Sequence, residues 1–125
     1  MTIVPDIQPK PPIRIGGRTF DWGAKTFVMG VINVTPDSFS GDGVAISSAG
    51  AGVDVERVVR MARQFVEWGC DIIDVGGEST RPAFTYADAA PTSEADELRR
   101  VIPVIRAIVE AVDLPVSIDT YKVPV

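Results

Sequence analysis

The chain has 125 residues, with 12 basic and 17 acidic side chains, a formal net charge of −5, one cysteine and no histidine. This length allows one hydrophobic core, and the acidic balance lacks the basic face that nucleic-acid phosphates require. The composition also excludes a Ser-His-Asp triad, histidine-ligated zinc and an intrachain disulfide. No run reaches the roughly 18 apolar residues of a membrane span, so we expect a cytoplasmic protein with neither a nucleic-acid nor a membrane partner.

The first part of the chain predicts a loose arm followed by a hairpin. Residues 1–12 are rich in proline and would bury little surface, so we assign them to an arm and residues 13–125 to one domain. Two short extended runs, Ile13–Ile15 and Arg18–Trp22, flank Gly16 and Gly17. A glycine pair between extended runs indicates a β-hairpin.

Strand and helix patterns alternate after the hairpin. Residues 26–34 are apolar at successive positions, which is typical of a strand buried on both faces. Residues 54–68 have helical spacing of apolar side chains, with Asp54 placed to cap the helix and Gly69 placed to end it. Residues 70–77 form a second apolar run that is too short for a helix.

A second helix and a third strand complete the alternation. Ser93 and Asp96 have the spacing of a helix start, and an apolar stripe continues to Val112. Pro103 lies within that stripe, so we expect a kink or an offset start of the helix. Residues 114–122 form a third apolar run. Strands alternating with helices predict an α/β fold with right-handed crossovers and a parallel sheet.

Polar side chains stand at the carboxyl ends of all three predicted strands, where parallel α/β folds bind their ligands. The strands end in or near Asn33, Asp74 and Asp119. Asn33 is either a neutral oxygen ligand for Mg²⁺ or a residue that makes a turn hydrogen bond. Each carboxylate either has an internal partner or accepts the N–H groups of a ligand. Their convergence predicts a binding site at this rim.

The loops after the first two strands add further candidates. Gly76 and Gly77 form either a tight turn or a close approach of the backbone to a ligand. Thr80 and Arg81 supply a hydroxyl and a planar cation suited to phosphate. Phe39 is either a mobile aromatic lid or an anchor for its loop.

Two segments resemble the signatures of dihydropteroate synthase, the folate-pathway enzyme that sulfonamides inhibit. They are MGVINVTPDSFSGDG at 29–43 and DIIDVGGESTRP at 71–82, and VSIDTYK at 116–122 is similar to the third strand of the same family. The resemblance implies an α/β chain that forms the first three βα units of a (β/α)8 TIM-type barrel, preceded by a hairpin across the barrel bottom. It also implies a transferase that joins 6-hydroxymethyl-7,8-dihydropterin diphosphate to p-aminobenzoate and releases diphosphate.

The resemblance implies roles for single residues. Asn33 matches the Mg²⁺ ligand, Thr80 a contact to the pterin diphosphate, and Asp119 the carboxylate that binds the pterin ring. Arg81 lies on the loop expected near diphosphate. No acid–base residue is implied, because a metal ion and a cation neutralise the leaving diphosphate.

The resemblance places two more residues at the p-aminobenzoate pocket, which are Phe39 and Pro82. The family usually reads Phe-Ser-Asp-Gly-Gly where this chain has Phe-Ser-Gly-Asp-Gly, so the substrate-loop aspartate, Asp42, is shifted by one residue.

The chain is short for this family, since a (β/α) barrel typically has about 250 residues. We therefore expect a truncated N-terminal portion that is inactive alone, and a homodimer for a full-length member. Two alternatives stay open, namely a pterin-binding module of the methyltetrahydrofolate methyltransferase kind and a non-enzymatic fragment.

Overall fold

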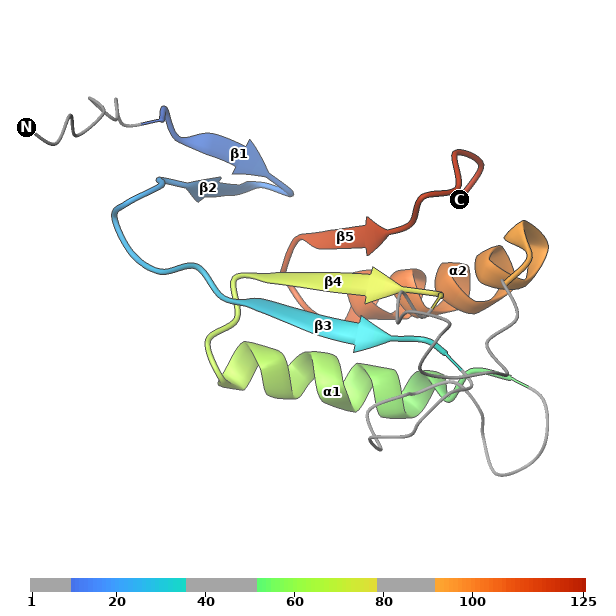
Figure 1. The fold of residues 1–125 in the computed structure, drawn as a ribbon. Coiled ribbons are helices and arrows are strands. Elements are labelled where there is room, and N and C mark those ends of the chain that lie inside the picture. The colour runs from blue at the N-terminus through green and yellow to red at the C-terminus, as the bar shows by residue number, and fades with distance from the viewer. Residues whose placement is uncertain (1–9, 36–51, 79–91) are drawn as a thin grey trace, which may run out of the picture.

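The computed structural model describes residues 10–35, 52–78 and 92–125, and these form a two-stranded hairpin and a three-stranded sheet with two helices (Figure 1). In chain order the elements are β1 (Ile13–Ile15), β2 (Arg18–Phe20), β3 (Met29–Asn33), α1 (Val55–Glu67), β4 (Ile72–Gly76), α2 (Glu94–Ala111) and β5 (Val116–Asp119). Most of the predicted arm lies outside the described residues, and residues 10–12 are exposed without regular structure.

The sheet confirms the predicted α/β alternation. Its strand order is β3-β4-β5, and both neighbouring pairs are parallel. Each crossover contains one helix, so β3-α1-β4 and β4-α2-β5 are two successive βαβ units. Neither described helix has the length and apolar character that crossing a membrane requires.

The local signals at the start of each helix are confirmed. Asp54 caps α1 by accepting a hydrogen bond of 2.9 Å from the backbone N–H of Arg57. Ser93 caps α2 through the N–H of Asp96 at 3.1 Å. The predicted offset start at Pro103 is wrong, because α2 begins at Glu94 and continues through the proline.

Packing on both sides of Pro103 explains this continuity. Val101, Val104 and Ile108 are all buried against the sheet, so the apolar stripe holds the helix across the missing backbone N–H.

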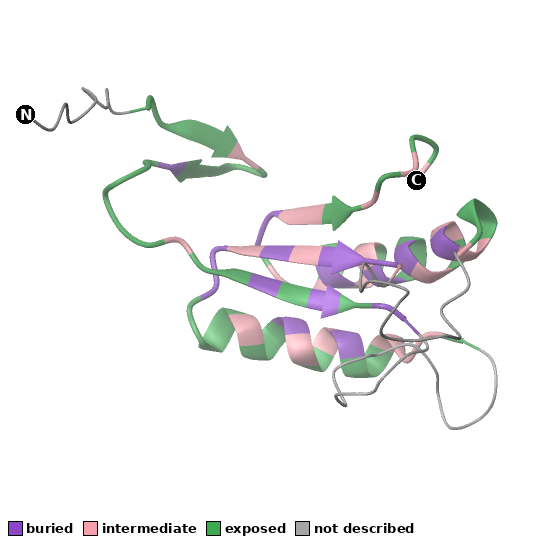
Figure 2. Cartoon of the chain, viewed as in Figure 1, coloured by how far each residue is buried: buried purple, intermediate pink, exposed green. Residues whose placement is uncertain are grey.

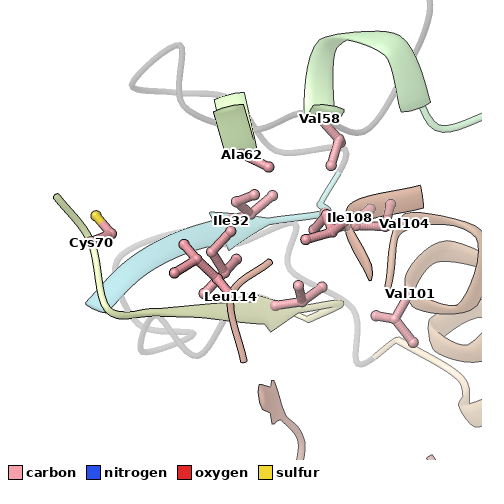
Figure 3. Close-up of a cluster of buried hydrophobic side chains, with 11 residues drawn as sticks. Ile32, Val58, Ala62, Cys70, Val101, Val104, Ile108 and Leu114 are labelled. Atoms are coloured by element: carbon pink, nitrogen blue, oxygen red, sulfur yellow. The ribbon is translucent and has the colours of Figure 1, made fainter. Parts of the chain in front are cut away.

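The core lies on one face of the sheet only. Both helices cover that face, where Ile32, Ile73 and Val75 belong to one core cluster with side chains from α1 and α2. Figure 3 shows Ile32 of β3 between the labelled side chains of the two helices. The expectation that the first strand is buried on both faces is wrong for the described residues, since Met29 is 53% and Val31 46% exposed. Figure 2 shows the resulting alternation along β3. The reason is that no described element covers the other face.

A glycine allows α1 to lie close to β3. A Cβ at Gly30 would stand only 2.4 Å from Cδ2 of Phe65, well inside van der Waals contact. The Phe65 ring therefore occupies the space that any larger side chain at position 30 would need.

The hairpin packs at the amino ends of the parallel strands. Gly16 and Gly17 form its turn with φ angles of 52° and 82°, which favour glycine. Arg18 Nη2 donates to the carbonyl of Asp113 at 2.5 Å, and Gly16 lies against Pro115, directly before β5. This position is opposite the strand ends that carry Asn33 and Asp119.

Asp71 joins the segment after the hairpin to the start of β4. Its side chain accepts hydrogen bonds from Lys25 Nζ at 2.5 Å and from the backbone N–H of Val28 at 2.9 Å. These two donors hold the pKa of the Asp71 carboxyl below its ordinary value of 3.8, with Lys25 as the larger cause.

We expect Gly30→Ala to destabilise the protein by about 1–3 kcal/mol, because the new methyl group overpacks the contact with Phe65. Urea unfolding of the complete open reading frame measures this loss. Phe65→Leu in the same background should recover part of it, giving a double variant whose loss is smaller than the sum of the single losses. Strict additivity would contradict the contact.

We expect Asp71→Asn to cost about 1–2 kcal/mol at pH 7, because the ion pair with Lys25 is lost and the Val28 N–H then donates to a neutral amide oxygen. A depressed pKa stabilises the fold above the unfolded value and this contribution disappears as pH falls through the folded value. The difference between parent and variant should therefore shrink towards pH 3 in urea unfolding. Asp21→Asn, an exposed aspartate of the same region, is the control. A difference that stays constant with pH would contradict the assignment.

Candidate functional site

The register of the sheet brings three predicted site positions into one row. Asn33 pairs with Gly76, and Gly76 pairs with Asp119. Neighbouring strands lie about 4.8 Å apart, so the Cα atoms of Asn33 and Asp119 are roughly 10 Å from each other. Because side chains alternate along a strand, all three positions face away from the helices.

Gly76 keeps the centre of this row free of a side chain. A Cβ at position 76 would lie 3.5 Å from Asn33 Oδ1, in ordinary van der Waals contact. The structure places Gly76 in β4 and not in a turn, and the close approach of a ligand to its backbone stays a prediction.

Asp119 ends β5 with an exposed carboxylate. Asn33 and Asp119 are both exposed, and the described residues form no side-chain hydrogen bond with either of them. Of the two alternatives that the sequence leaves open for Asp119, an internal partner is not found within residues 10–35, 52–78 and 92–125. Its exposure explains this, since a carboxylate in water carries no burial cost to offset.

Asp74 lies one layer below the row and has the internal partner that the sequence leaves open. It pairs in register with Ser117, whose hydroxyl donates to Asp74 Oδ1 at 2.5 Å. Both side chains are partly buried on the same face as Asn33 and Asp119. This pair links β4 to β5 just beneath the candidate site.

The other predicted site residues lie outside the described part of the chain. They are Phe39, Asp42, Thr80, Arg81 and Pro82. The structure therefore brings together Asn33, Gly76 and Asp119, and the remaining assignments stay predictions.

A buried group of charges next to the site is missed by the sequence analysis. It consists of Glu78, Glu97, Arg100 and Lys122, and we call it the Lys122 cluster. Lys122 Nζ contacts Glu97 Oε2 at 2.6 Å and also hydrogen-bonds Glu78 Oε2. Lys122 holds the pKa of Glu78 below its ordinary value, and Glu78, followed by Glu97, raises the pKa of Lys122.

One signal for this cluster is present in the sequence. Glu78 directly follows the second predicted strand and Lys122 is the last residue of the third predicted run, so the parallel sheet places both near the same edge. Glu97 carries no such signal, because a glutamate in the first turn of a helix normally faces solvent.

Comparison with known proteins identifies the family. The family model for pterin-binding enzymes matches residues 29–125. A dihydropteroate synthase from Clostridium beijerinckii is 46% identical over 113 residues, covering 90% of this chain and 38% of that protein.

Solved structures agree with the sequence match. A dihydropteroate synthase from Xanthomonas albilineans with 4-aminobenzoic acid has a TM-score of 0.68 and 40% identity, covering 90% of this chain and 37% of that one. A Burkholderia cenocepacia dihydropteroate synthase complexed with 7,8-dihydropteroate has a TM-score of 0.62 and 32% identity, covering 89% and 31%.

A parallel α/β sheet with polar groups at its carboxyl edge is the arrangement in which folds of this class bind ligands. The chain belongs to the pterin-binding enzyme family, and its relatives are dihydropteroate synthases. It spans little more than a third of the length of the relatives it matches.

We expect Ser117→Ala to destabilise the protein by about 1–2 kcal/mol, because it leaves the partly buried Asp74 carboxylate without its hydroxyl donor. Combining it with Asp74→Ala should give a loss smaller than the sum, since the two side chains share one interaction. Urea unfolding of the complete reading frame for the four variants of this cycle measures the coupling. A coupling of zero would show that the hydrogen bond contributes nothing.

Proposed function

We propose that this chain is part of a dihydropteroate synthase. The protein would join 6-hydroxymethyl-7,8-dihydropterin diphosphate to p-aminobenzoate and release diphosphate, in folate biosynthesis. The observation that carries this proposal is the row of Asn33, Gly76 and Asp119 at the carboxyl edge of a sheet whose relatives are dihydropteroate synthases. The related structures with 4-aminobenzoic acid and 7,8-dihydropteroate support one of these substrates and the product.

Asp119 is suited to bind the pterin ring. A pterin presents adjacent N–H donors along one edge, and a carboxylate accepts two such bonds in parallel. The exposed position of Asp119 at the end of β5 leaves both of its oxygens available for such an edge. The carboxylate would hold the ring while the reacting methylene group points away from it.

Asn33 fits a magnesium site of the kind that relies on substrate oxygens. Mg²⁺ keeps several waters and takes few protein ligands when phosphate is present. The described residues hold no group of three acidic, cysteine or histidine side chains that would bind a metal alone. The amide oxygen of Asn33, which lies beside the side-chain-free position of Gly76, would be that one protein ligand, and the ion would supply charge neutralisation for the diphosphate.

The remaining roles follow from the sequence motifs. Thr80 and Arg81 would contact the pterin diphosphate, and Phe39 and Pro82 would line the p-aminobenzoate pocket, near the shifted Asp42. The described sheet and helices would be the first part of a (β/α)8 barrel with the hairpin at its bottom. A full-length member would be a cytoplasmic homodimer that sulfonamides inhibit.

The direct test is an assay of the complete open reading frame with both substrates and Mg²⁺. Formation of dihydropteroate, its loss with a chelator and its recovery with Mg²⁺ are the expected results. Competition by sulfonamide and not by methyltetrahydrofolate would separate this function from that of a methyltransferase module. No product with both substrates present would overturn the proposal.

In the same assay we expect Asp119→Asn to raise the KM for the pterin diphosphate at least tenfold, because one of two parallel charged hydrogen bonds becomes a donor clash. The KM for p-aminobenzoate should change much less. Asp113→Asn is the matched control, since Asp113 is exposed at the opposite end of β5. Equal kinetic constants for the parent and Asp119→Asn would remove Asp119 from the pterin site.

A further inference from the structure

The Lys122 cluster joins three segments that are distant in the sequence. Glu78 follows β4, Glu97 and Arg100 lie in the first part of α2, and Lys122 stands three residues after β5. The side chains of Lys122 and Glu78 are each 14% exposed, and that of Glu97 is 1% exposed. Lys122 is the one cation that both carboxylates contact among the described residues.

Burial of the charged side chains in this cluster costs desolvation free energy. Removing charged groups from water costs free energy that their mutual attraction offsets only with good geometry and further hydrogen bonds. Glu97 Oε1 is buried without a hydrogen-bond partner among the described residues. Apolar side chains of similar size would fill the same space without that cost, so a role in placing the connected segments is the better explanation.

A glycine at position 77 leaves the space that the Glu97 side chain occupies. A Cβ at Gly77 would stand 2.7 Å from Glu97 Cγ and 2.7 Å from Val101 Cγ1. Glycine at position 77 therefore lets the first part of α2 approach the end of β4 closely enough for Glu97 to reach Lys122.

The cluster bonds directly to both ends of the segment 79–91. Glu78 Oε1 accepts from the backbone N–H of Thr92 at 3.0 Å. Arg100 Nη1 donates to the carbonyl of Gly77 at 3.1 Å and to Thr92 Oγ1 at 3.3 Å. Residues 77 and 78 before the segment and residue 92 after it are thus held together by two charged side chains.

Lys122 extends the same connection to the end of β5. Its side chain contacts Glu78 and Glu97, and its backbone N–H donates to Thr120 Oγ1 at 3.1 Å. The turn that follows Asp119 is therefore fixed to the residues that precede Thr80 and Arg81. One lysine connects two elements that the proposed function assigns to substrate binding.

We propose that Lys122, held between Glu78 and Glu97, is a positioning residue that holds Gly77 and Glu78, at the end of β4, at a defined place relative to Asp119. Lys122 acts through these neighbours and does not itself contact substrate. The inference rests on the proposed function, since it assigns the pterin diphosphate as the molecule whose binding depends on this placement.

The chain provides a lysine–carboxylate pair for comparison at the other end of the sheet. Lys25 and Asp71 form an ion pair of 2.5 Å that joins two segments at the amino ends of the strands. Lys25→Met removes the lysine of that pair away from the proposed site, as Lys122→Met does beside it. A purely structural role predicts that both variants change only stability.

The experiment measures steady-state kinetics and thermal unfolding of the complete open reading frame, at a temperature where each variant is folded. We expect Lys122→Met to raise the KM for the pterin diphosphate about tenfold or more, and Lys122→Arg to restore most of this loss. Glu78→Gln keeps the Lys122–Glu97 pair and should raise the same KM several-fold. Lys25→Met should lower the unfolding temperature with the KM within twofold of the parent.

The possible results separate the positioning role of Lys122 from the proposed function. If Lys122→Met does not fold, Glu78→Gln carries the test alone. An active parent with parent-like KM values for Glu78→Gln and Lys122→Met, or a KM rise equal to that of Lys25→Met, would overturn the positioning role while leaving the proposed function intact. An inactive parent would overturn the proposed function and this inference with it.

Discussion

In-register pairing of three parallel strands is the constraint on which the site depends. Asn33, Gly76 and Asp119 are far apart in the sequence and share no local motif, yet the ladder places them side by side. A slip of one residue in either pair would turn an entire strand over, exchanging the polar row for the buried residues that pack on the helices. Burial of Ile32 and Val75 against α1 and α2 therefore fixes the register, and with it the geometry of the polar row.

Close packing of helices on the sheet follows from two glycines with different consequences. Gly30 accommodates the ring of Phe65 and thereby seats α1 on β3, which serves the core. Gly77 leaves space for Glu97, so the first part of α2 packs beside the end of β4 and the carboxylate of Glu97 is buried there. Gly30 thus supports apolar packing, because α1 places Phe65 against it. Gly77 supports a polar connection, because α2 places Glu97 there.

Each end of the sheet has its own ion pair between segments that are distant in the sequence. The two pairs differ in burial and in the number of carboxylates that share the lysine. At the amino ends, the Asp71 carboxylate accepts hydrogen bonds from Lys25 and from a backbone N–H, and the Lys25 side chain is about half exposed to solvent. At the carboxyl ends, Lys122 is shared by two carboxylates and is nearly buried. A partly solvated pair adapts to small movements, whereas a buried shared cation favours one arrangement of its partners. The more constrained construction lies at the end that carries the polar row.

The sequence by itself determined the order of elements, both helix caps, the glycine turn of the hairpin and the strand ends that carry Asn33 and Asp119. These features depend on residues close together in the chain, through periodicity, capping oxygens and positive φ angles. The tertiary structure decided which face of β3 is buried, the continuity of α2 through Pro103, the partner of Asp74 and the burial of Glu97. Each of these depends on contacts between segments distant in the sequence, and no local pattern encodes which side chain will meet which across the sheet.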